Sequence, residues 1–225
     1  MGPHGVSAPR TLTIPARLYE ATWPRSFARI YDAAFAMAER SGLRDLRRAV
    51  LSEAVGRSVE LGAGTGLNLA LYPSTVTDVM LTEPDRHMAR RLARTMTGTR
   101  FSATLVRASA TAIPVADASV DTVISTLVLC TVPDPDAVLN EVARILKPGG
   151  RLLFIEHVRS SSPNVARWQD RLCTPWRWCA CGCHCNRDTV ATMESSPLQV
   201  QSIRHERLRW LTPLLRPLVV GAAVR

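Results

Sequence analysis

Short apolar runs alternate with segments of helical periodicity between residues 58 and 158. The apolar runs are SVEL (58–61), VTDVMLT (76–82), ATLVRA (103–108), VDTVIST (120–126) and RLLFIEHV (151–158). Helical periodicity covers 66–72, 85–96 and 135–146, and the last of these segments stops at a Lys147-Pro148-Gly149-Gly150 turn. This strand-helix alternation predicts an α/β fold whose parallel strands are covered by helices on both faces.

The flanking segments extend this picture on both sides. Residues 1–15 are rich in Pro, Gly and Ser and are expected to form a mobile tail, whereas 16–56 show helical spacing with a break at Ser41-Gly42. Beyond residue 198, LQVQSIRHERL and PLVVGAAV predict two closing strands. We therefore expect a mixed sheet of about seven strands over 57–225, preceded by a helical lid, with an insertion at about 160–198.

The stretch VELGAGTG (59–66) follows the first strand with a Gly-x-Gly-x-Gly turn. Gly62 and Gly64 permit backbone conformations and close approach that a Cβ would block, and Gly66 lets the next segment pack tightly. Such a loop alone also serves dinucleotide sites and plain tight turns, so its partner residues decide what it binds.

Glu83 stands at the carboxyl end of the second strand, in LTEPDRHM. A carboxylate at this position can accept hydrogen bonds from both ribose hydroxyls, although Glu83 or Asp85 could instead cap the next helix. The loop lacks the Gly-x-Gly-x-x-Gly spacing of dinucleotide binders, which favours a ribose-bearing cofactor without phosphates.

The motifs VELGAGTG, EPDRHM, ATAIPVADASVDTVIST and EVARILKPGGRLLFIEH resemble, in order, those of class I S-adenosylmethionine-dependent methyltransferases. The resemblance implies a Rossmann-like fold and S-adenosylmethionine as cofactor, with S-adenosylhomocysteine as product. Ser109 stands where these enzymes often have Asp. The cofactor-binding residues implied are Glu60, Gly62, Ala63, Gly64, Gly66, Asn68, Glu83, Pro84, Met88, Ser109, Ala110, Thr126 and Leu127.

A narrower set of segments is similar to the alkyl thiol S-methyltransferase branch and its bacterial relatives: STLVLCTVPDP, FIEHVRS, LCTPWRW, GCHCNRDT and RPLVVGAAVR. It implies S-methylation of a small thiol, with O-, N- or C-methylation in specialised metabolism as the alternative. His157 and His184 are the candidate catalytic residues, because a thiol must lose its proton before attack. The candidate substrate-lining residues are Trp23, Tyr31, Cys130, His157, Cys183 and His184.

Each of these side chains also has a purely structural interpretation. His157 can simply hydrogen-bond a loop, Cys130 can be a small buried apolar residue, and Trp23 and Tyr31 can be core residues. The sequence alone leaves both interpretations open.

Cysteines crowd the stretch WRWCACGCHC (176–185), which raises the possibility of a zinc site. Structural zinc sites usually combine Cys-x2–4-Cys with a second pair far along the chain, and here the spacing is one with no second pair. The sequence therefore predicts no metal and a substrate-covering loop, in which Cys179, Cys181 and Cys185 have no assigned role. A thiol- or metal-sensing protein is the weaker, non-enzymatic alternative.

The formal charge of +9 would suit a nucleic-acid partner, but the arginines that carry it are scattered along the chain. We therefore expect a small-molecule acceptor and no nucleic acid, a nucleic-acid methyltransferase being the less favoured alternative. No apolar run reaches the roughly 18 residues of a membrane helix, and no signal peptide is recognisable, so a cytoplasmic protein without membrane contact is expected.

Overall fold

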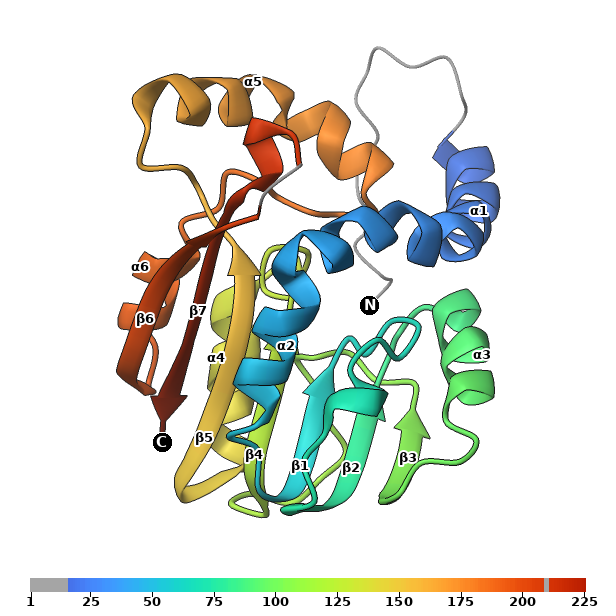
Figure 1. The fold of residues 1–225 in the computed structure, drawn as a ribbon, viewed down its shortest axis with the longest axis vertical. Helices are drawn as coiled ribbons and strands as arrows, with labels where there is room; N and C mark the ends of the chain where they lie inside the picture. Colours follow the sequence, from blue (N-terminus) through green and yellow to red (C-terminus); the bar gives the residue numbers. More distant parts are fainter. Residues whose placement is uncertain (1–15, 209–210) are drawn as a thin grey trace.

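A seven-stranded mixed sheet forms the centre of the computed structural model, which describes residues 16–208 and 211–225 (Figure 1). The strand order is β3-β2-β1-β4-β5-β7-β6, with β1 to β5 parallel and β7 antiparallel to both of its neighbours. The predicted fold class is thereby confirmed. The strands are β1 (Gly56–Leu61), β2 (Val76–Thr82), β3 (Ser102–Val106), β4 (Val120–Thr126), β5 (Leu146–His157), β6 (Gln199–Arg207) and β7 (Pro217–Val224).

Helices cover both faces of this sheet, because alternate side chains of the central strands point to opposite sides. On β5, Leu152 and Phe154 pack into one core with helices α4 (Pro135–Ile145) and α6 (Thr189–Glu194). Leu153 and Ile155 point the other way, into a second core shared with α2 (Arg44–Leu51) and α3 (Arg86–Thr95).

Three helices begin at aspartates that cap them. Asp85 accepts the backbone N–H groups of His87 and Met88 at the start of α3, which settles the cap in favour of Asp85 rather than Glu83. Asp134 caps α4, and Asp188 caps α6. Glu83 is thus free of a capping role.

Two local expectations are wrong. Residues 66–72 form no α-helix; only a 3-10 turn, Leu69–Leu71, follows the glycine loop. The expected turn at 147–150 is part of β5, because Gly149 N donates to Arg225 O (3.3 Å) and Arg225 N donates to Gly150 O (3.1 Å). Pairing with the distant C-terminus therefore extends the strand through this segment.

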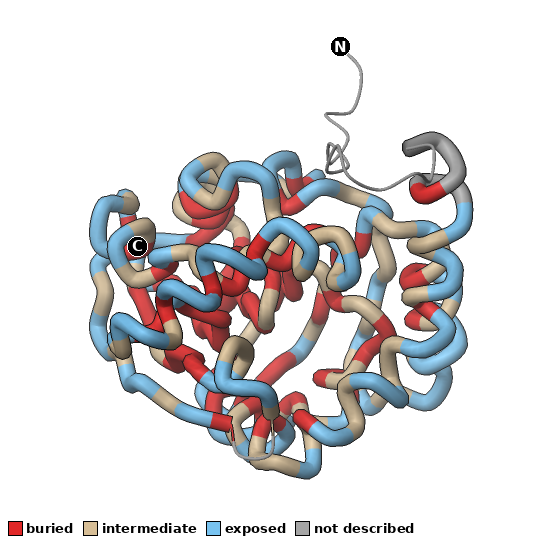
Figure 2. Tube along the Cα trace, turned by 90° about the horizontal axis from the view of Figure 1, so that it is seen from above, coloured by how far each residue is buried: buried red, intermediate tan, exposed pale blue. Residues whose placement is uncertain are grey.

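The remaining helices lie over the carboxyl ends of the parallel strands. Helix α1 (Ala16–Ala38) continues through a π-helical turn into α2, with the predicted break at Gly42, whose φ is 116°. Helix α5 (Pro163–Cys179) lies over the same edge (Figure 1). Seen from this end, buried segments run through the middle of the molecule and exposed ones follow its periphery (Figure 2).

Among the residues that the structure describes, no helix is long and apolar enough to cross a membrane. The expected tail, 1–15, lies outside the described residues.

Candidate functional site

A cavity of about 710 Å³ lies where the carboxyl ends of the parallel strands meet α1 and the end of α5. Open parallel sheets bind ligands at this edge, and the volume is in the range of small-molecule sites. Its wall combines three kinds of surface: the glycine loop with Glu83, an aromatic row on α1, and a group of sulfur and imidazole side chains.

The glycine loop supplies backbone to the cavity through Gly62 and Gly64. Gly64 has a φ of 59° and its N–H donates to Glu83 Oε2 at 2.9 Å, while a Cβ on it would meet nothing closer than Gly62 O at 3.9 Å. Gly66 packs inward instead, where a Cβ would lie 2.8 Å from Leu69 and 2.9 Å from Leu92. The loop thus presents backbone without side chains to the cavity at Gly62 and Gly64, and at Gly66 it packs against the core behind it.

Glu83 is buried in the cavity wall and points its carboxyl group at the loop. Oε2 accepts Gly64 N and Oε1 accepts Asp85 N (2.8 Å). Burial raises the pKa of Glu83 to about 7, against the two backbone hydrogen bonds that lower it. Each carboxylate oxygen has two acceptor sites, so one on each oxygen is left for a ligand.

Four other predicted cofactor residues line the cavity on the α3 side: Pro84, Met88, Ser109 and Ala110. Leu127 joins them from the loop after β4, where it has a φ of 62° and donates its N–H to Ile155 O (2.7 Å). A leucine held in the left-handed region is uncommon, and the bond to β5 offsets part of the strain.

Five predicted cofactor residues lie outside the cavity lining: Glu60, Ala63, Gly66, Asn68 and Thr126. Three of them form a buried network beneath the loop, in which Asn68 Nδ2 donates to Glu60 Oε1 (2.9 Å) and to Thr126 Oγ1 (3.1 Å). Tyr72 also donates to Glu60, at 2.5 Å, and burial raises the pKa of Glu60. Glu60, Asn68 and Thr126 therefore lie beneath the glycine loop, where their hydrogen bonds hold its shape.

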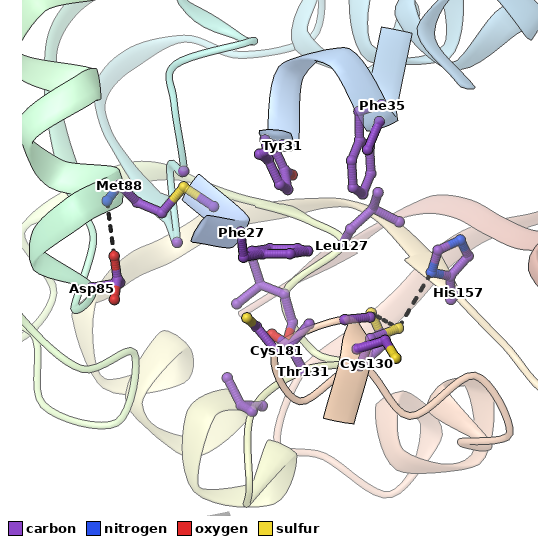
Figure 3. Close-up of a pocket in the computed structure, with 18 of the residues that line it drawn as sticks. Phe27, Tyr31, Phe35, Asp85, Met88, Leu127, Cys130, Thr131, His157 and Cys181 are labelled. Atoms are coloured by element: carbon purple, nitrogen blue, oxygen red, sulfur yellow. Dashed lines mark hydrogen bonds between the residues drawn. The ribbon is translucent and has the colours of Figure 1, made fainter. Parts of the chain in front are cut away.

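Four aromatic side chains follow one another along α1 at i, i+4 spacing: Trp23, Phe27, Tyr31 and Phe35. The ring centroids of Tyr31 and Phe35 are 4.3 Å apart and those of Phe27 and Tyr31 are 5.5 Å apart (Figure 3). Only Trp23 and Tyr31 of this row were among the predicted lining residues, although the spacing of four is visible in the sequence and indicates the whole row. Burial raises the pKa of Tyr31 to about 12, so its phenol stays neutral.

Helix α1 is fixed at both sides of the cavity. Trp23 Nε1 donates to Cys179 O at the end of α5 (3.1 Å). On the other side, Asp32 accepts the Thr65 hydroxyl of the glycine loop (2.6 Å) and pairs with Arg91 of α3. No sequence pattern indicates Asp32, because its partners, Thr65 and Arg91, are far along the chain.

Cys130 and His157 lie at the end of the cavity that is far from α3 (Figure 3), and Cys183 lies beside them; all three residues are buried. Cys183 Sγ lies 3.9 Å from Cys130 Sγ and 3.7 Å from His157 Nδ1. The hydrogen bond between the thiols, aided by His157, lowers the pKa of Cys183, and the same bond together with burial raises the pKa of Cys130.

His184, the second candidate catalytic histidine, is not in the cavity lining. Its backbone N–H donates to Cys130 O (2.7 Å), which binds the loop to the end of β4. Burial, with Arg187 and Arg177 nearby, lowers the pKa of His184 to about 4. Of the flanking cysteines, Cys179 and Cys181 line the cavity.

The methyltransferase domain family model matches residues 59–154. Thiol S-methyltransferase TMT1A of Homo sapiens is 31% identical over 204 residues, covering 88% of this chain and 83% of that protein. Thiol S-methyltransferase TMT1B of Rattus norvegicus is 35% identical over 167 residues, covering 72% of this chain and 66% of that protein. Among solved structures, a possible histamine N-methyltransferase from Thermotoga maritima superimposes with a TM-score of 0.66 at 20% identity, over 89% of this chain and 97% of that one.

Proposed function

Because this chain belongs to the class I S-adenosylmethionine-dependent methyltransferases, in the thiol S-methyltransferase branch, we propose that it methylates the sulfur of a small thiol. The observation that carries the proposal is a single cavity, in which the glycine loop and Glu83 line one part and Cys130, His157 and Cys183 another. The first part would hold the cofactor, and the second the acceptor.

The residues around Glu83 fit S-adenosylmethionine. The free acceptor site on each oxygen of Glu83 matches two adjacent ribose hydroxyls, and the bare backbone of Gly62 and Gly64 leaves room for the methionine portion. Met88 and Ala110 offer apolar surface for the adenine, and Ser109 adds one polar group. When bound, the cofactor supplies an electrophilic methyl group on a sulfonium.

The remainder of the cavity suits an apolar thiol. The aromatic row of α1 excludes water and holds an acceptor by apolar contact. An in-line displacement requires both, because the nucleophile must stay close to the methyl carbon in a site without water. A thiol, with an ordinary pKa of about 8.5, must lose its proton, and His157 is the imidazole that lines this part of the cavity. The helical lid, 16–56, would close the cavity over both ligands.

A panel of acceptors tests the proposal. Alkyl and aryl thiols, with phenols and amines of matched size, are incubated with the full chain and S-adenosylmethionine, and S-adenosylhomocysteine is quantified. We expect turnover of the apolar thiols and background rates for the matched phenols and amines. If phenols or amines were methylated and none of the thiols were, the proposed S-methylation would be rejected in favour of O- or N-methylation.

Cofactor affinity is expected to fall as the pH is lowered through about 7. The ionised form of Glu83 accepts the ribose hydroxyls, and its pKa in the folded protein is raised to about 7, so protonation below that pH removes the better acceptor. By linkage the dissociation constant should rise up to about tenfold per pH unit below the pKa. Titration calorimetry between about pH 5.5 and about pH 8 measures this.

Glu83→Gln is the control for this pH dependence, since the amide does not titrate in that range. Its affinity should be weaker but nearly flat with pH. The same steep dependence in both proteins would exclude Glu83 as its source.

A further inference from the structure

The cluster of Cys130, His157 and Cys183 has the composition of a metal site. It is assembled from three separate segments: the turn after β4, the end of β5 and the loop after α5. One ligand atom from each side chain lies within 4.8 Å of the other two. Thiolate and imidazole are the ligands that zinc prefers.

Two interatomic distances in the cluster, from Cys183 Sγ to Cys130 Sγ and to His157 Nδ1, agree with tetrahedral zinc coordination. Zn–S bonds of about 2.3 Å and Zn–N bonds of about 2.0–2.1 Å place two sulfur ligands about 3.8 Å apart, and a sulfur and a nitrogen about 3.6 Å apart. In the structure, Cys183 Sγ lies 3.9 Å from Cys130 Sγ and 3.7 Å from His157 Nδ1. These two distances exceed the tetrahedral values by only about 0.1 Å, and the third pair, Cys130 and His157, lies within 4.8 Å.

The fold holds all three segments in place without the metal. His184 N donates to Cys130 O, and Arg187 donates to the carbonyls of Leu129 and Val132, so the Cys183 loop is bonded to the end of β4. Thr189 Oγ1 donates to His157 O (3.2 Å) and bonds the same segment to β5. A preformed set of ligands with supported backbones is what distinguishes a metal site from a chance cluster.

All three side chains line the cavity, so the fourth tetrahedral position would be reached from it. Three protein ligands with one open position are the arrangement of catalytic rather than structural zinc. With zinc bound, two thiolates and a neutral imidazole would leave the site without net charge.

We propose that Cys130, His157 and Cys183 bind one zinc ion whose open position takes the sulfur of the thiol acceptor. The proposal deepens the proposed function and rests on it for the identity of the acceptor. The thiol displaces a bound water, its proton passes to solvent, and a zinc–sulfur bond forms. Zinc is not a redox ion, so no oxidant or reductant is involved. The bound sulfur keeps a lone pair for the incoming methyl group. With zinc bound, His157 acts as a ligand, and coordination to the metal takes over from it the deprotonation of the thiol.

This site differs from the cysteine run at 179–185, for which the sequence predicted no metal. The run of cysteines at 179–185 contributes only Cys183, while Cys179 and Cys181 are exposed and Cys185 is buried with its Sγ 3.9 Å from Gln169 O. The other two ligands stand 53 and 26 residues away from Cys183. Substituting single cysteines therefore distinguishes a site made of Cys130, His157 and Cys183 from a site made of the cysteine run.

Metal content provides the first readout. The full chain without a polyhistidine tag is kept reduced, incubated with zinc, desalted and analysed by atomic emission, and about one zinc per chain is expected. Cys183→Ser and Cys130→Ser should each lose the metal, whereas the matched Cys179→Ser should retain it. Cobalt substitution should produce a thiolate-to-cobalt charge-transfer band in the wild type and in Cys179→Ser, and none in Cys183→Ser.

Cofactor titration of each variant confirms that it is folded, since Glu83 and the glycine loop are not changed. Reduced wild-type protein that binds no zinc, or zinc that is lost in Cys179→Ser and kept in Cys183→Ser, overturns the metal site. Neither readout depends on methyl transfer. Thiol methylation by a protein that binds no zinc would reject the metal and leave the proposed function standing, while bound zinc without thiol methylation would reject the proposed acceptor.

Discussion

Replacing Glu83 with Ala is expected to weaken S-adenosylmethionine binding by about 100-fold or more. Two hydrogen bonds to an ionised acceptor contribute roughly 1.5–3 kcal/mol each, and about 2.7 kcal/mol in total already corresponds to a factor of 100. The same change leaves Gly64 N and Asp85 N without their side-chain acceptor, so the loop loses its fixed shape as well. Titration calorimetry at about pH 8 gives the dissociation constant directly, because the wild-type carboxyl group is ionised there.

Asp85→Asn is the matched control for this substitution. Asp85 also lines the cavity, but its side chain is engaged as the cap of α3, which an asparagine can also provide. It should bind the cofactor within a few-fold of the wild type. A Glu83→Ala protein that binds within threefold of the wild type would rule out Glu83 as the ribose partner.

Replacing Glu156 with Ala is expected to lower the free energy of unfolding by about 3 kcal/mol or more. The buried carboxyl group accepts Ser125 Oγ (2.6 Å) and the backbone N–H groups of residues 128, 129 and 130 (3.1, 3.0 and 3.2 Å). Each buried donor left without a partner costs about 1–3 kcal/mol, and the alanine adds a cavity. Urea unfolding followed by circular dichroism measures the difference.

Ser125→Ala provides the comparison, because it removes one of the four hydrogen bonds and leaves the backbone donors bonded. Its expected loss is about 1 kcal/mol. Equal losses in the two variants would mean that the three backbone hydrogen bonds contribute little to stability. The Glu156 variant should also bind less zinc, since the segment that carries Cys130 loses its support.

Much of the fold could be predicted because its determinants are local. The strands at 58–61, 76–82 and 120–126 are short apolar runs bounded by turn residues, and their order predicts the parallel sheet. The caps at Asp134 and Asp188 are also local, since a carboxylate satisfies N–H groups two or three residues away. Backbone hydrogen bonding and burial within one segment decide these features.

The expected helix at 66–72 does not form, for one local and one tertiary reason. The local reason is that the segment between Gly66 and Pro73 is too short for two helical turns. The tertiary reason is that its polar side chains form hydrogen bonds beneath the glycine loop. Asn68 is bonded to Glu60, Thr126 and Arg47, and Tyr72 is bonded to Glu60. These partners are buried, so satisfying them outweighs one turn of helix.

The sequence by itself determined the order of the strands, the glycine loop and the position of Glu83 at a strand end. It could not determine which distant side chains meet. Cys183 is surrounded by cysteines along the chain, yet its neighbours in space are Cys130 and His157. The reason is that parallel strands end at one edge of the sheet, and long-range backbone hydrogen bonds bring the loop after α5 to that edge. Only the tertiary structure therefore brings one cysteine of the run, Cys183, together with Cys130 and His157.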